Sequence, residues 1–72
     1  MGHIERMEIE FKELSTKIAK GRDFFEKQAS KFLDDTQFHN LEFQLKAMEL
    51  YHRILRARIE YDKKMLTEEL IK

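Results

Sequence analysis

The segment from about Gln37 to Leu70 contains neither proline nor glycine, and it carries two rows of apolar side chains. Within each row most residues recur at intervals of three and four, which is typical of one face of an α-helix. We define the first row as Phe38, Leu41, Leu45, Met48, Leu55, Ile59 and Leu66. We define the second row as Phe43, Ala47, Leu50, Ile54, Ala57, Tyr61 and Met65. At about 100° per residue, the two rows fall on nearly opposite sides of one long helix.

The first half of the chain carries a single apolar row, at Ile4, Met7, Phe11, Leu14 and Ile18. This spacing predicts a long amphipathic helix. Gly21 interrupts the row, and a glycine inside a helix costs about 1 kcal/mol relative to alanine. The sequence therefore predicts either one long helix that is kinked at Gly21 or two helices that are divided there.

A turn is predicted at residues 34–36, where Asp34, Asp35 and Thr36 interrupt the apolar pattern. Asp34 and Gln37 also have the spacing of a capping box, in which a side chain at each position satisfies the backbone N–H of the other. A short connection between two long helices makes them antiparallel neighbours. The predicted fold is all-α, an antiparallel helical hairpin with residues 1–72 as a single domain.

Such a hairpin can cover only one side of its second helix. The other side would be left as an apolar band, and soluble monomers rarely expose contiguous apolar patches beyond a few hundred Å² unless they bind something. We assign the partner-binding role to the second row, Phe43, Ala47, Leu50, Ile54, Ala57, Tyr61 and Met65, although the pattern allows either row to face the first helix. If Gly21 divides the first helix, a three-helix arrangement could instead bury both rows internally.

Composition indicates how so short a chain could be stabilised. With 72 residues it forms one domain with a thin core, and domains of this size commonly need disulfides, a metal or a partner chain. There is no cysteine, and His3, His39 and His52 lack the spacing of zinc ligands. A partner chain is the remaining source of stability, and we expect no metal and no cofactor.

The charges argue against several classes of partner. Fourteen basic and fourteen acidic residues are well mixed, whereas a nucleic-acid site needs a basic face. Arg53, Arg56 and Arg58 form the one basic concentration, and Glu49 and Glu60 lie alongside it. No apolar run approaches the roughly 20 residues of a membrane span, and the N-terminal stretch is too charged for a signal peptide. We expect a cytoplasmic protein.

No catalytic arrangement is recognisable. Ser15 and Ser30 have no histidine and acid at the spacing of a known motif, and there is no glycine-rich phosphate loop. A two-helix hairpin also offers little concavity in which to shift the pKa of a carboxylate. We therefore expect that the chain is not an enzyme.

The second half of the chain resembles a known family. It contains Gln37-Phe38 after the turn, then Lys46-Ala47-Met48-Glu49, then Ile54-Leu55. These residues are similar to the second helix of the small co-chaperones of the type III secretion needle subunit. The resemblance implies a cytoplasmic hairpin that binds a second chaperone made of helical repeats. Together the two would hold the needle subunit soluble and prevent its early polymerisation.

The sequence also allows two other hypotheses about the assembly and role of the chain. In one, two copies bury the second row against each other in a homodimeric four-helix bundle, whose role is structural or is RNA binding through the arginines. In the other, the chain is a piece of a longer coiled-coil protein, as the spacing from Ile4 to Ile18 allows.

Overall fold

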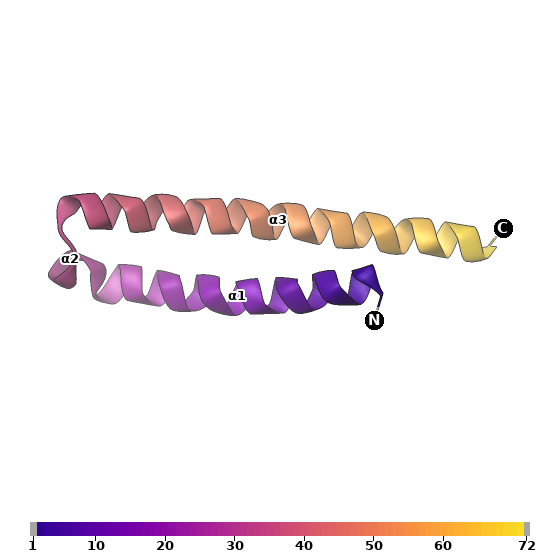
Figure 1. Cartoon of the computed structure of the whole chain (residues 1–72), viewed down its shortest axis with the longest axis horizontal. Coiled ribbons are helices and arrows are strands. Elements are labelled where there is room, and N and C mark those ends of the chain that lie inside the picture. Colours follow the sequence, from indigo (N-terminus) through magenta and orange to yellow (C-terminus); the bar gives the residue numbers. More distant parts are fainter. Residues whose placement is uncertain (1, 72) are drawn as a thin grey trace.

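The computed structural model describes residues 2–71, and these residues form three helices and no strand. Helix α1 spans His3–Lys27, the single turn α2 spans Ala29–Phe32, and α3 spans Asp35–Ile71 (Figure 1). The predicted all-α class is confirmed. Met1 and Lys72, the two ends of the predicted 1–72 domain, lie outside the described residues.

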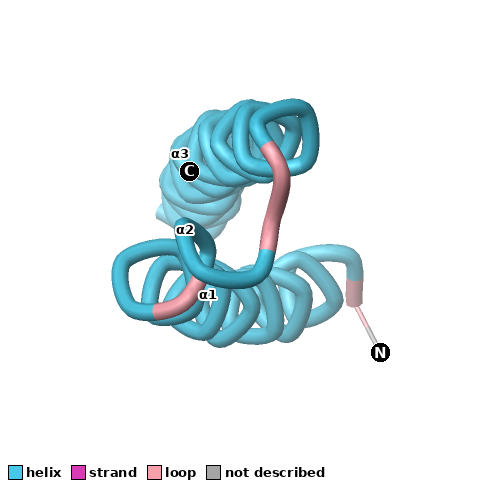
Figure 2. The backbone as a smooth tube through the Cα atoms, turned by 90° about the vertical axis from the view of Figure 1, so that its left-hand side faces the viewer, coloured by secondary structure: helices cyan, strands magenta, loops and turns pink. Residues whose placement is uncertain are grey.

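Helices α1 and α3 lie side by side and run in opposite directions (Figures 1 and 2). Residues early in α1 meet residues late in α3, since His3 Nε2 lies 3.0 Å from Asp62 Oδ2. At the other end, the rings of Phe25 and Phe38 lie 4.7 Å apart. The result is a rod with extents of 57 × 17 × 16 Å, only two helices thick.

The core lies along the seam between α1 and α3. From α1 it takes Met7 and Leu14, and from α3 it takes Leu45, Leu55 and Ile59, all of them buried. Leu45, Leu55 and Ile59 belong to the first row, so it is the first row that faces α1, which the sequence left open. Removing these side chains from water supplies about 25 cal/mol per Å² of apolar surface buried, which is the main force that holds the helices together.

Gly21 does not divide the first helix. Helix α1 continues through it to Lys27, and Gly21 has an ordinary negative φ, so the prediction of two helices divided there is wrong. The glycine instead gives room to α3, because a Cβ built at Gly21 would lie 2.6 Å from Leu45 Cδ2. That distance is far inside van der Waals contact, so the residue's role is close packing between helices.

Helix α1 ends at Lys27, and its C-cap Gln28 departs from helical geometry with φ −129° and ψ −22°. Leu33 is extended, and together with Asp34 it joins α2 to α3 (Figure 2). The predicted turn at residues 34–36 is thus placed too late, because Asp35 and Thr36 already belong to α3.

The predicted capping box at the start of α3 is confirmed. The backbone N–H of Gln37 donates to Asp34 Oδ1 at 2.8 Å, and the backbone N–H of Asp34 donates to Gln37 Oε1 at 3.3 Å. Each side chain therefore satisfies a backbone group that no helical turn would otherwise satisfy.

Helix α3 is longer than α1 and continues past its start (Figure 1). Because α1 begins at His3, opposite Asp62, no helix formed by residues 2–71 lies beside the last turns of α3. Leu66 of the first row is consequently exposed, although the other residues of this row lie beside α1. Within residues 2–71, no helix is both long and apolar enough to cross a membrane.

Candidate functional site

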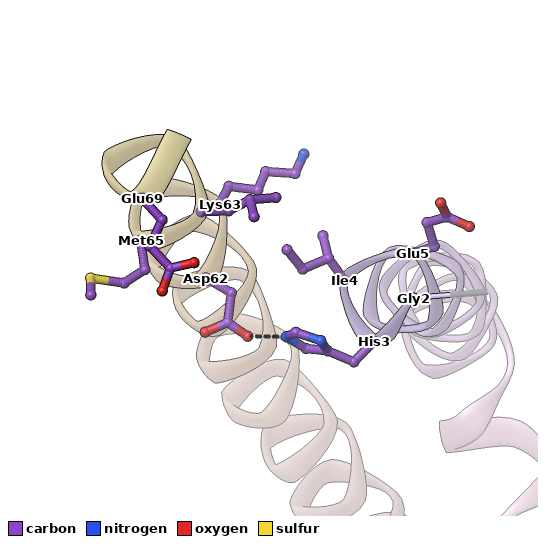
Figure 3. A pocket seen from close by; sticks show the side chains of 9 residues that line it. Gly2, His3, Ile4, Glu5, Asp62, Lys63, Met65 and Glu69 are labelled. Atoms are coloured by element: carbon purple, nitrogen blue, oxygen red, sulfur yellow. Dashed lines mark hydrogen bonds and ion pairs between the residues drawn. The ribbon is translucent and has the colours of Figure 1, made fainter. Parts of the chain in front are cut away.

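The second row forms a continuous apolar strip on the side of α3 that faces away from α1. All seven of its residues are exposed. Phe43, Leu50 and Tyr61 keep 63%, 58% and 62% of their surface accessible, which is high for large apolar side chains. At the open end of the rod, Met65 points away from α1 while Ile4 points toward α3 (Figure 3). The structure therefore brings the predicted partner-binding residues together on one face and leaves them uncovered.

The strip is regular because of its spacing. From Phe43 to Tyr61 the intervals are 4, 3, 4, 3 and 4 residues, an average close to the 3.5 of a coiled-coil seam. At 1.5 Å per residue these side chains extend over about 27 Å of helix. A partner helix could therefore follow the strip without interruption.

Helix α1 offers no comparable surface. Among the described residues, the large exposed apolar side chains lie mostly on α3, and α1 contributes Ile9 alone. The apolar row that the sequence predicted for α1 is used against α3, where Met7 packs with Leu55 and Ile59. The apolar surface available for binding thus belongs to α3 alone and is not formed jointly by α1 and α3.

Charged residues border the strip. Lys46, Arg53 and Glu60 follow one edge, and Arg58 lies on the other, as their angular positions on the helix require. No ion pair within residues 2–71 involves Lys46 or Arg53, although Glu49 and Arg53 have the i,i+4 spacing of a helical ion pair. Glu49 instead pairs across the seam, accepting a hydrogen bond from Arg22 Nε at 2.6 Å.

The three arginines of α3 do not form one basic patch. Arg56 pairs with Glu60, at 3.2 Å from Nε to Oε1. Arg53 and Arg58 are five residues apart and so lie about 140° apart around the helix, on opposite edges of the strip. A phosphate backbone needs adjacent cations, so this arrangement does not favour RNA binding.

The seam contains a polar contact that the sequence did not suggest. Ser15 Oγ and His52 Nε2 lie 2.6 Å apart, and the His52 ring stacks on Phe11 with centroids 4.1 Å apart. Ser15 Oγ also lies 2.9 Å from the carbonyl oxygen of Phe11. No carboxylate among the described residues hydrogen-bonds to His52, so the pair lacks the third group that orients a catalytic histidine. The contact links α1 to α3. It could not be predicted from the spacing of the two residues, because they are 37 positions apart in the sequence.

A second polar link lies beside it. The Tyr51 hydroxyl donates to Glu10 of α1, and this hydrogen bond holds the pKa of Tyr51 above its ordinary value of 10.0. The charge of Glu10 acts in the same direction, because a phenolate beside a carboxylate is disfavoured. The Tyr51–Glu10 link thus ties α1 to α3 next to the exposed strip.

The open end of the rod is hollowed between the start of α1 and the last turns of α3, with a volume of about 610 Å³. His3 and Asp62 meet across it, while Ile4 and Met65 contribute apolar surface (Figure 3). Among residues 2–71, no three His, Cys, Asp or Glu side chains are placed to hold a metal ion. The hollow is a consequence of the unequal helix lengths and carries no grouping of reactive side chains.

Comparison with known proteins identifies one family. No curated protein and no solved structure matches the chain. The model of the Sequestin family matches residues 1–61, which contain α1, α2 and the part of α3 that carries the strip from Phe43 to Tyr61. Since the match covers most of the 72 residues, the chain belongs to the Sequestin family.

Proposed function

We propose that this chain is a helical hairpin that binds another protein chain through the second row of α3. The observation that carries the proposal is the exposure of all seven residues of that row on the face opposite α1. Soluble monomers rarely expose contiguous apolar patches beyond a few hundred Å², and larger ones mark interaction sites. The role is that of a binding module, not of an enzyme.

The energetics are consistent with this role. Covering the row would release about 25 cal/mol per Å² of apolar surface, less the cost of association and of ordering side chains. Phe43 and Tyr61 lie at its two ends, and aromatic side chains dominate the binding energy of many interfaces. The rod is only two helices thick, so a partner would also add to its limited stability.

In its specific form, the proposal is a cytoplasmic co-chaperone. The resemblance to the co-chaperones of the type III secretion needle subunit includes Ala47 and Ile54, which belong to the exposed row. The row would pack on the helical-repeat chaperone of that system, whose concave surface suits an amphipathic helix. The pair would keep the needle subunit soluble and unpolymerised.

Co-expression tests this form directly. The chain would be produced with a helical-repeat chaperone and a needle subunit of a type III secretion system, and the soluble complex would be isolated by size. We expect a ternary complex with the unmodified chain and none with Leu50→Asp, because a carboxylate would be buried in the interface. Ile9→Asp is the matched control, since Ile9 is an exposed apolar residue of α1 outside the row. Absence of any complex with the unmodified chain would refute the co-chaperone role.

A second candidate is a homodimer with a structural role. It is favoured by the side-chain sizes of the second row, which are nearly the same in both directions from Phe43 to Tyr61.

A further inference from the structure

The part of the second row from Phe43 to Tyr61, which leaves out Met65, is nearly symmetric in side-chain size. From Phe43 to Tyr61 it consists of an aromatic, a small, two aliphatic, a small and an aromatic residue: Phe43, Ala47, Leu50, Ile54, Ala57 and Tyr61. The intervals of 4, 3, 4, 3 and 4 residues are also the same in both directions. The midpoint lies at residue 52. A strip that is the same from both ends can match a second copy of itself that runs the opposite way.

We propose that a second copy of this chain covers the second row, with its α3 antiparallel to the first and a two-fold axis level with residue 52. This deepens the proposed binding function and rests on it. In this register Phe43 faces the partner's Tyr61, Ala47 faces the partner's Ala57, and Leu50 faces the partner's Ile54. Each layer thus combines residues of similar size.

The residues beyond the strip fit the same register. The next layer joins Asn40 to the partner's Lys64, so the apolar interior ends at polar side chains on both sides. Helix α1 of each copy would lie on the outside, because Ile9 is the one large exposed apolar residue it has among the described residues. Each copy therefore contacts the other through α3 alone. In a four-helix bundle, both helices of each hairpin would contribute to the interface.

Charge along the edges selects the antiparallel orientation. On one edge, Lys46 would face the partner's Glu60, and symmetry gives that opposite-charge contact twice. Arg53 would approach its own copy near the axis, which is a single like-charge contact. A parallel pair would instead set Arg53 beside the partner's Arg58 twice and would leave Lys46 with no acidic neighbour across the edge.

Self-association of this kind would keep the strip covered. Any other protein that binds the second row would have to displace the second copy, so binding and dimer dissociation would be coupled through one surface. The homodimer would then be the resting form of the binding module.

Light scattering and cross-linking test the proposal together. We expect the unmodified chain to have twice the molar mass of one chain, and Leu50→Asp to have that of one. The chain has no cysteine, so introduced ones are unique. With a short bis-maleimide reagent, Arg53→Cys is expected to cross-link to itself, while Lys46→Cys is not, because its two copies would lie about 18 Å apart along the helix axis. The double variant with Lys46→Cys and Glu60→Cys should cross-link between chains.

The opposing results are distinct. A monomer at every concentration would refute the second copy and leave the binding surface itself standing. Self-cross-linking of Lys46→Cys as fast as that of Arg53→Cys would refute the antiparallel register. A dimer that persists in Leu50→Asp would refute this inference, because the copies would then meet elsewhere, and it would leave the second row free for another partner.

Discussion

At the scale of single residues, the close approach of α1 and α3 depends on Gly21. The glycine costs helical propensity in the middle of α1, yet it leaves the space that the buried Leu45 side chain occupies. Gly21 thus lowers the helix propensity of α1 but allows α3 to pack closely against it. Its effect on stability should therefore depend on what stands at position 45.

We predict that Gly21→Ala has opposite consequences in two backgrounds. In a Leu45→Ala background it should stabilise the chain by about 1 kcal/mol, since alanine is the better helix former and the space is open. In the unmodified chain that gain should be cancelled or reversed, because the new Cβ meets Leu45 Cδ2. Urea unfolding followed by circular dichroism measures the difference, at one fixed protein concentration.

A Leu41→Ala background serves as the control for this cycle, because within 4 Å a Cβ at Gly21 meets Leu45 alone. There the effect of Gly21→Ala should match that in the unmodified chain. Equal effects in all three backgrounds would show that Leu45 does not confine position 21.

The start of α3 is also decided by single residues. Asp34→Ala removes the acceptor for the Gln37 N–H, so we expect a loss of about 1 kcal/mol in the free energy of unfolding. Thr36→Ala should change it little, because Thr36 makes no side-chain hydrogen bond among the described residues. Thermal unfolding of the two variants measures the loss of stability in each. Similar losses would mean that the Asp34 cap does not stabilise the start of α3.

At the scale of elements, the two long helices are joined by polar links as well as by the core. Tyr51 donates to Glu10 across the seam, and this hydrogen bond raises the pKa of Tyr51. A group whose pKa is raised on folding contributes stability that is fully present below its unfolded pKa, near 10. That contribution is lost as the pH rises through the raised folded pKa.

The loss of stability of the hairpin at alkaline pH should therefore depend on Tyr51. We predict that Tyr51→Phe lowers the melting temperature at neutral pH, and that this deficit shrinks as the pH rises above 10. Tyr61→Phe is the control, since Tyr61 is an exposed tyrosine of α3 with no hydrogen bond to α1 among those described. A deficit that stays constant with pH would show that the Tyr51 hydroxyl does not stabilise the seam through Glu10.

Much of the element structure could be predicted from the sequence. Periodic apolar residues predicted the helices, and Asp34 with Gln37 predicted the capping box at the start of α3, although the predicted turn at residues 34–36 lay too late. The end of α1, with its C-cap at Gln28, was not predictable, because glutamine is a good helix former and no glycine or proline stands nearby. Pairing across the seam was equally hidden, since Ser15 and His52 meet only because the antiparallel register of α1 and α3 aligns them.

At the scale of the whole molecule, the rod presents two opposite sides of α3. The first row is covered by α1 as far as α1 extends, and the second row is not covered. The sequence placed the two rows on opposite sides but could not rank them, because both have helical spacing and similar composition. Only the packing of Gly21 against Leu45, and of Met7 against Leu55, identifies the inner row.

The central claim is that one side of α3 is core and the other is a binding surface. The most direct test compares two adjacent residues, Ile54 in the exposed row and Leu55, which has no exposed surface. Each is replaced by aspartate, and the helical content of both variants is measured by circular dichroism at 25 °C. We predict that Leu55→Asp loses most of its helix, because a carboxylate would be buried unpaired in the core. Ile54→Asp should stay largely helical, and comparable loss of helix in both variants would contradict the claim that the second row is a surface.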